Sequence, residues 1–248
     1  METSRDQTII HSLVEIADNL VENFDVVDLL TSLTDRCVNV LGVSAAGVML
    51  ASPSGELRLV ASSSDVMQVV ELFELQANEG PCLDAFDTGE PVEHENLANG
   101  TGRWPQFAEV AYAGGFRSVF ALPLRLRDTT IGALNLFSVD ESPMDESDVM
   151  VARGFADLAT ISILQHGGAI ETQHVNEQLT RALKDRIVVE QAKGVVSERA
   201  GVDMREAFSR LRSYARAHRL PLAEVAEAAI DGTLEASAWL EPASPPGR

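Results

Sequence analysis

The chain has few cysteines, few lysines and no long apolar run. Among its 248 residues, Cys37 and Cys82 are the only cysteines, too few for a disulfide framework or a four-ligand zinc site. No stretch approaches the ~20 apolar residues of a membrane-spanning helix. The first residues lead into an amphipathic segment rather than the apolar core of a secretory signal. We therefore expect a cytoplasmic protein with no metal site and no membrane partner.

The sequence also lacks the motifs of several enzyme classes. It contains no Gly-x-Ser-x-Gly elbow, no Walker A loop and no Gly-x-Gly-x-x-Gly fingerprint. His94 has no second His or Cys at ligand spacing, so we interpret it as a surface side chain. We interpret Asp84, Asp87 and Glu90 as the solvated acidic end of a helix rather than a catalytic pair. No cofactor is identified and no enzyme is expected, although a Ser–His–Asp triad stays an open alternative.

Positive charge is scarce in most of the chain and concentrated near its C-terminus. The protein has 19 Lys+Arg against 38 Asp+Glu, a net charge of −19, which argues against nonspecific nucleic-acid binding. Residues 1–174 hold eight Arg, no Lys and 27 acids, and therefore carry the whole −19. Residues 181–219 instead carry ten bases and five acids, a net +5. This asymmetry indicates two modules with different partners, although a merely solvated helical surface would also produce it.

Hydrophobic periodicity predicts an α+β domain in the N-terminal two thirds of the chain. Alternating apolar runs joined by turn residues predict strands and a hairpin, and apolar residues at helical spacing predict helices. Pro91 is expected to open a further short extended piece. The predicted helices span residues 7–23, 26–40, 65–73, 81–88, 103–112 and 145–165, and the predicted strands span residues 47–51, 57–61, 118–126 and 130–139. Such interspersed elements favour a mainly antiparallel sheet.

The sequence pattern of the C-terminal region predicts a small bundle of three helices. The first helix is predicted over residues 175–199 and ends at Ala200-Gly201, with the glycine after the last turn. Asp203 caps the second helix, and Pro221 begins the third. Helices of these lengths with short connections pack as a bundle. The last segment, residues 241–248, has no apolar content to bury and is expected to be a disordered tail.

Basic side chains gather on one face of each of the first two bundle helices. Arg186 and Lys193 share a face of the first helix with Glu190, and pairing along that helix, worth only ~0.3–0.5 kcal/mol, is the alternative reading. Gly194 costs about 1 kcal/mol in mid-helix, and its missing side chain would let a ligand approach. The corresponding row on the second helix is Arg205, Ser209, Arg212 and Arg216. Arginines at this spacing suit phosphates or base edges.

These helices resemble the ANTAR domain in two segments, Arg186-Ile-Val-Val-Glu-Gln-Ala-Lys-Gly-Val195 and Glu206-Ala-Phe-Ser-Arg-Leu-Arg212. The resemblance covers residues 175–235. It implies an RNA-binding antiterminator that holds paired hairpins in nascent leader transcripts, so that a terminator hairpin cannot form. By motif position, the RNA-binding residues would be Arg186, Gln191, Lys193, Gly194 and Arg212. Arg216 joins them as a member of the arginine row on the second helix. A protein–protein module, in which the basic helices dock an acidic partner, is the alternative.

The N-terminal region is similar to a GAF domain over residues 8–165. The matching segments are Glu79-Gly-Pro-Cys-Leu-Asp84, Gly89-Glu-Pro-Val92, Arg103-Trp104, Ser118 to Leu124 and Ile131-Gly-Ala-Leu-Asn-Leu136. The resemblance implies a sensor whose small-molecule ligand, if there is one, is unknown. Cys82 is the candidate residue for the ligand site, because a helix N-terminus would lower the pKa of its thiol as in a redox sensor. We favour a buried structural thiol instead.

The two resemblances together predict a sensor, a connecting segment at residues 166–174 with Gly167-Gly168 as hinge, and an RNA-binding bundle. The flanking helices 7–23 and 147–165 have more apolar residues than are needed to cover one face of the sheet. In the family such helices pair between subunits, so a homodimer is expected. Two bundles would then meet two hairpins at high effective concentration. Two alternatives stay open: a sensor-domain enzyme, and basic helices docked back on the acidic sensor in an autoinhibited state.

Overall fold

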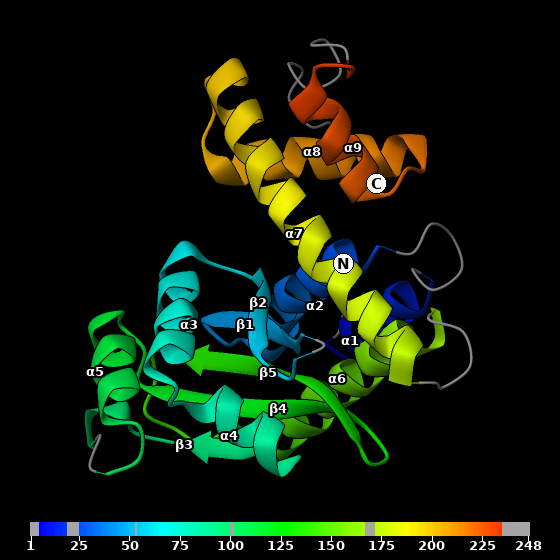
Figure 1. Ribbon diagram of the computed structural model, residues 1–248. Helices are drawn as coiled ribbons and strands as arrows, with labels where there is room; N and C mark the ends of the chain where they lie inside the picture. The colour runs from blue at the N-terminus through cyan, green and yellow to red at the C-terminus, as the bar shows by residue number, and fades with distance from the viewer. Residues whose placement is uncertain (1–4, 19–24, 53, 100–101, 167–171, 235–248) are drawn as a thin grey trace.

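The N-terminal part of the chain forms a five-stranded sheet between two layers of helices (Figure 1). The computed structural model describes residues 5–18, 25–52, 54–99, 102–166 and 172–234. The strand order is β2-β1-β5-β4-β3, and every neighbouring pair is antiparallel. The strands are β1 (Ala45–Ala51), β2 (Leu57–Ser62), β3 (Val92–His94), β4 (Ser118–Leu126) and β5 (Thr129–Ser138). This architecture confirms the predicted α+β fold class.

Each face of the sheet has its own helical cover and its own apolar core. Helices α1 (Arg5–Asp18), α2 (Val26–Leu41) and α6 (Glu146–His166) pack on one face, and α3 (Asp65–Ala77), α4 (Pro81–Thr88) and α5 (Pro105–Ala113) on the other. In β1, Val48 and Leu50 join the first core, while Met49 joins the second. Because successive strand side chains alternate between faces and both faces are covered, every residue of β1 is buried.

The element boundaries differ from the sequence expectation at several points. Strand β1 begins at Ala45, and the extended piece after Pro91 becomes the edge strand β3, followed by the 3-10 turn η1 (Leu97–Asn99). The edge strand is too short for alternation to reveal it. Residues 19–23 of the first predicted helix, the proposed hinge Gly167-Gly168 and the predicted tail lie outside the described residues.

Helix α3 is rotated relative to the face that its apolar residues predict. Val66 and Val69 are half exposed or more, whereas Glu71 and Glu74 are completely buried. The helix is capped by Ser64, whose side chain accepts the hydrogen bond from the Met67 amide. Periodicity assigns the charged face to solvent, so this orientation depends on the tertiary surroundings of the two carboxylates.

The two buried carboxylates lie between α3, the sheet and the start of α4. Glu74 accepts hydrogen bonds from the Cys82 amide (2.7 Å) and from the Asn135 side chain (3.2 Å). Glu71 lies against the backbone at Gly47, where a Cβ would clash with it, and neither of its oxygens has a hydrogen-bond partner of standard geometry among the described residues. Burial raises the pKa of Glu74 to about 8. Burial, and then the charge of Glu74, raise the pKa of Glu71 well above its usual value.

The Glu79-to-Asp84 segment holds α4 and α5 together. Glu79 caps α5 by accepting bonds from the amides of Gln106 (2.6 Å) and Phe107 (3.0 Å). Asp84 accepts from the Arg103 guanidinium and from the Trp104 indole nitrogen at 3.0 Å. The interpretation of Asp84 as a solvated helix end is therefore wrong, because the loop before α5 folds back over α4 and supplies donors to this carboxylate.

The C-terminal residues form the expected three helices. They are α7 (Thr172–Ala200), α8 (Met204–His218) and α9 (Leu222–Asp231), which pack together through alanine, valine and leucine side chains. Asp203 caps α8 by accepting from the Glu206 amide, as its spacing predicts. Helix α7 runs from the N-terminal domain (residues 8–165, called the sensor domain after its expected role) to the far side of the bundle (Figure 1), and it also contacts α2 and β2.

Asp25 ties the bundle to the sensor domain at a second place. One oxygen caps α2 by accepting from the amides of Val27 (2.8 Å) and Asp28 (3.0 Å). The other oxygen accepts from the Ala223 amide, in the first turn of α9, at 3.1 Å. Both helix N-termini thus share one carboxylate, which suits the partial positive charge there.

The raised pKa of Glu74 gives a pH dependence of stability. The unfolded chain releases this proton near pH 4.5, whereas the folded chain keeps it up to about pH 8. Stability should therefore fall as the pH rises through this window. We expect a lower melting temperature at pH 8 than at pH 5.5 and a clearly smaller drop in Glu74→Gln. Glu109→Gln, an exposed control, should behave as the parent does; identical profiles for all three proteins would contradict the assignment.

The double role of Asp25 predicts that Asp25→Ala costs more stability than loss of a simple cap. Removing an N-cap costs roughly 0.5–2 kcal/mol, and here a bond to α9 is lost as well. Asp203→Ala is the matched control, because Asp203 caps only α8. We expect urea unfolding, followed by circular dichroism, to show the larger loss for Asp25→Ala. Equal losses would show that the contact with α9 adds nothing.

Candidate nucleic-acid interface

Four of the predicted RNA-binding side chains meet at one cavity. Helix α7 supplies Arg186 and Lys193, and α8 supplies Arg212 and Arg216, each pair at the spacing that keeps it on one helix face. The cavity has a volume of about 430 Å³ and lies between the bundle and the sensor domain. Its sensor-side wall is formed by Thr31, Asp35, Ser62, Ser63, Ser64, Asp65 and Gln68.

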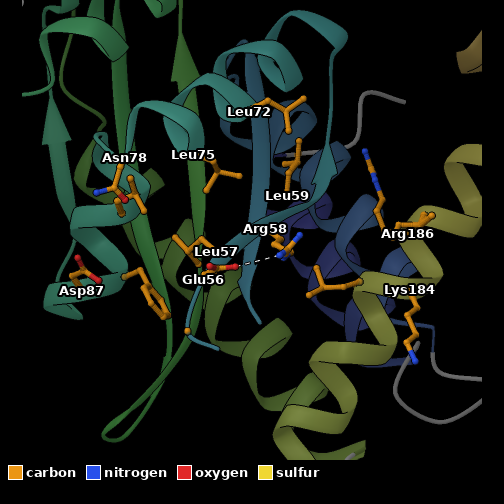
Figure 2. A pocket seen from close by; sticks show the side chains of 15 residues that line it. Glu56, Leu57, Arg58, Leu59, Leu72, Leu75, Asn78, Asp87, Lys184 and Arg186 are labelled. Carbon is orange, nitrogen blue, oxygen red and sulfur yellow. Dashed lines mark hydrogen bonds and ion pairs between the residues drawn. The ribbon is translucent and has the colours of Figure 1, made fainter. Parts of the chain in front are cut away.

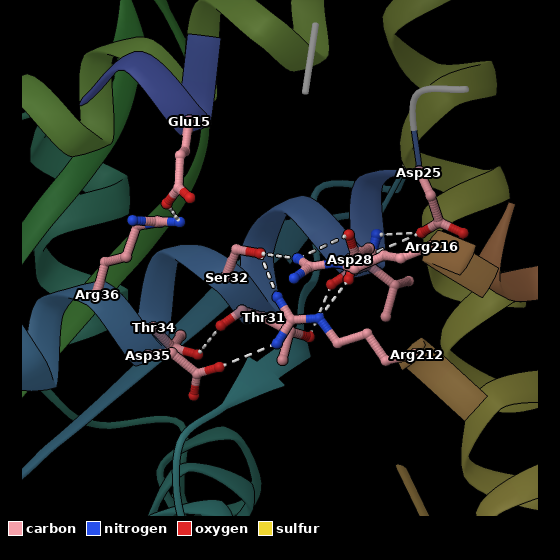
Figure 3. A network of polar contacts seen from close by, with 11 residues as sticks. Glu15, Asp25, Asp28, Thr31, Ser32, Thr34, Asp35, Arg36, Arg212 and Arg216 are labelled. Carbon is pink, nitrogen blue, oxygen red and sulfur yellow. Dashed lines mark hydrogen bonds and ion pairs between the residues drawn. The ribbon is translucent and has the colours of Figure 1, made fainter. Parts of the chain in front are cut away.

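Arg212 is bound by acceptors of helix α2. Its Nε donates to Oδ1 of Asp28 at 2.6 Å, and its Nη1 donates to Oδ2 of Asp35 at 3.1 Å. Its Nη2 donates to the hydroxyl of Ser32 (Figure 3). The side chain is 17% exposed. The guanidinium fork therefore already has partners in all three directions.

Arg216 lies one turn further along α8 and is held more loosely. It contacts Ser32 at 3.2 Å and Asp28 at 3.5 Å, and 55% of its side chain is exposed. An exposed ion pair of this length contributes little to stability.

Arg186 and Lys193 both pair with Glu190, which is the pairing along the helix that their spacing allows as the alternative to RNA binding. Glu190 lies 2.9 Å from each cation. Arg186 also donates from Nη1 to the carbonyl of Val60 in β2 at 2.7 Å. Burial lowers the pKa of Arg186, while Glu190 and Glu71 oppose this shift. Lys193 also lies 5.7 Å from the centroid of the Phe208 ring, within reach of a cation–π attraction.

Gln191 and Gly194 lie outside the cavity, on a neighbouring face of α7. Gln191 is exposed. A Cβ at Gly194 would meet nothing within 4 Å, so packing within the described part of the chain does not require glycine there. With Ile187, which is 60% exposed, they form an open strip on α7 that a ligand could approach.

The sensor-side partners of the arginines, Asp28, Ser32 and Asp35, are not among the residues that the sequence predicts for the site. Their spacing of four and three residues places them on one face of α2, and this was the available signal. Nothing in the sequence links that face to α8, because the contacting residues are 177 to 188 positions apart.

The thiol environment is the opposite of the one a redox sensor needs. Cys82 is buried, and burial, reinforced by Glu74 and Glu71, raises the pKa of its thiol well above the usual value. A reactive cysteine needs a lowered pKa. Cys37 is also buried, and its pKa rises to about 12. The described residues include no group of three or more His, Cys, Asp or Glu side chains that could hold a metal ion.

A second cavity of about 830 Å³ lies where α7 passes the edge strand β2. Figure 2 shows Leu57, Leu59, Leu72 and Leu75 on its sensor side and Lys184 and Arg186 on α7. The volume of this cavity and its partly apolar lining are typical of sites that bind small molecules.

Comparison with known proteins matches both parts of the chain. An ANTAR domain model matches residues 177–230, and a GAF domain model matches residues 25–163. No curated protein matches the chain. No helix in the described part of the chain is both long and apolar enough to cross a membrane.

Solved GAF domains share the fold of the sensor region at low sequence identity. The GAF domain from Acinetobacter phosphoenolpyruvate-protein phosphotransferase is 18% identical, with a TM-score of 0.52 over 69% of this chain and 98% of its own. The GAF domain of the Coxiella burnetii phosphoenolpyruvate-protein phosphotransferase is 16% identical, with a TM-score of 0.51 over 66% and 98%. The observed sheet with its two helical layers is the fold of these GAF domains, and the GAF model matches the same part of the chain. The chain therefore belongs to the GAF family, and its C-terminal helices form an ANTAR domain.

Proposed function

We propose that this protein is a signal-responsive regulator that binds paired hairpins in nascent leader transcripts and thereby prevents transcription termination. The ANTAR match and the convergence of four basic side chains on one cavity carry this proposal. In it, residues 8–165 sense the signal and residues 175–235 bind RNA. The role is regulatory rather than catalytic.

The bundle offers two kinds of RNA contact. Lys193, Arg212 and Arg216 would pair with phosphates, since ammonium and guanidinium groups are the usual phosphate ligands. Gln191 lies exposed on the open strip and, with Arg186, would reach bases in the loops, where RNA is read in single-stranded form. The bare backbone at Gly194 would let the RNA approach α7 closely.

Exposed apolar side chains on α1 and α6 support a homodimer. Ile10 is 61% exposed, Val14 49% and Met150 71%, and α1 packs beside α6. Gly154, one turn after Met150, has open space where its Cβ would be, which would let a second helix approach. A dimer through this face would present two bundles to two hairpins, and avidity would raise the affinity over that of one bundle.

The RNA site is tested by the only two lysines of the chain. Lys193→Ala should weaken RNA binding about tenfold, or ~1.4 kcal/mol, whereas Lys184→Ala, with the same charge change on the same helix, should change it about twofold or less. Transcripts identified by crosslinking in cells and sequencing supply the RNA, and filter binding at fixed salt measures the affinity. Recovery of no transcript would refute the RNA-binding function. An equal loss of RNA affinity in both variants would show that binding depends on net charge alone and not on the position of Lys193.

The dimer is tested by charge placed on the apolar face. Met150→Glu with Ile10→Glu should convert a dimer into a monomer in sedimentation equilibrium, because the buried carboxylates would have no partners. Val69→Glu, on α3 in the opposite layer and 63% exposed, is the control and should remain dimeric. A monomeric parent, or a dimer in all variants, would overturn this interface.

A further inference from the structure

Helix α2 presents a row of acceptors to the proposed RNA-binding face. Asp28, Ser32 and Asp35 lie on one side of α2, and all three bind Arg212 (Figure 3). The carboxylate oxygens stand 2.6 and 3.1 Å from two different guanidinium nitrogens. This is the arrangement by which a guanidinium also binds phosphate oxygens.

These contacts use the side chain that RNA would need. Arg212 is 17% exposed and Asp28 20%, so both are largely withdrawn from water, where charge-assisted hydrogen bonds are stronger than at an open surface. A phosphate can reach the Arg212 donors only after the carboxylates leave. Binding to α2 and binding to RNA therefore exclude each other at this residue.

We propose that the acidic face of α2 is a binding surface for the RNA-contacting face of the bundle, with Asp28 and Asp35 in the place of RNA phosphates. This inference rests on the proposed function and adds its regulation. In the arrangement seen here the bundle is held closed against the sensor domain, and RNA must displace α2 to bind.

Further contacts hold the same arrangement. Arg186 donates to the Val60 carbonyl of β2, and Asp25 accepts from the Ala223 amide of α9. The sensor domain thus contacts all three helices of the bundle. A signal that shifts α2 or β2 would weaken several of these contacts together, while Gln191 and Gly194 stay accessible for a first encounter with RNA.

The test compares full-length proteins that differ only in carboxylates. Asp28→Asn with Asp35→Asn keeps the side-chain shape and removes both charges that face Arg212. The matched control is Glu109→Gln with Asp128→Asn, which removes two charges from exposed sites of the same domain and so corrects for the general repulsion of RNA. The probe is a synthetic pool of transcripts with two stem-loops and randomised loop bases, and filter binding gives the affinity.

We expect the α2 variant to bind the pool about tenfold more tightly than the parent and the control to bind as the parent does. Equal affinity of parent and α2 variant would overturn the inference and leave the RNA-binding function standing. An equal gain in the control would overturn it too, because net charge would then explain the effect. If no protein binds the pool and crosslinking recovers no transcript, the proposed function fails, and this inference with it.

A single substitution keeps the test decisive if the double variant does not fold. Asp35→Asn changes a carboxylate that is 49% exposed and touches Arg212 through one contact. It should give a smaller gain in the same direction. No gain in a folded Asp35→Asn protein would count against the closed arrangement.

Discussion

The arrangement of the whole molecule depends on helix α7, which is continuous for 29 residues. At 1.5 Å per residue it is about 43 Å long. Its first half passes the sensor domain, where Arg186 bonds to β2, and its second half is buried among α8 and α9 through Val189, Ala192 and Val196. Because a helix is stiff, the placement of the bundle follows from the placement of α7, and the meeting of α8 with α2 follows from both.

The opposite charges of the two modules explain why they meet where they do. Residues 1–174 carry the entire net charge of the protein, yet only a few carboxylates of the sensor domain face the bundle. Those on α2 lie at helical spacing opposite arginines at helical spacing on α8. Because each row lies on one helix face, Arg212 contacts both carboxylates of α2 and Arg216 contacts one of them.

Much of the fold could be predicted from the sequence, because its signals are local. The cap at Asp203, the proline at the start of α4, the alternation in β4 and β5 and the period of the bundle helices each depend on neighbours within a few residues. Helix α3 shows the limit of such signals. Its buried Glu74 accepts bonds from β5 and α4 and its buried Glu71 lies against β1, and no local pattern contains these contacts.

The same distinction holds at the candidate site. Helical spacing predicts correctly that Arg186 and Lys193 share a face, and that Arg212 and Arg216 share another. It also predicts the pairing with Glu190. It gives no information on Asp28 or Asp35, because contacts between the two modules arise from how α7 is placed against the sheet.

The continuity of α7 makes its length a constraint as strict as its composition. One residue inserted between Arg186 and the buried Val196 would turn the remaining helix by about 100° and advance it 1.5 Å. The arginines of α8 would then face away from α2, although every side chain would still be present. A chimera that joins this bundle to a different sensor would therefore have to preserve the helical phase across the junction, and a fusion with the correct domains in the wrong phase would lose the coupling between them.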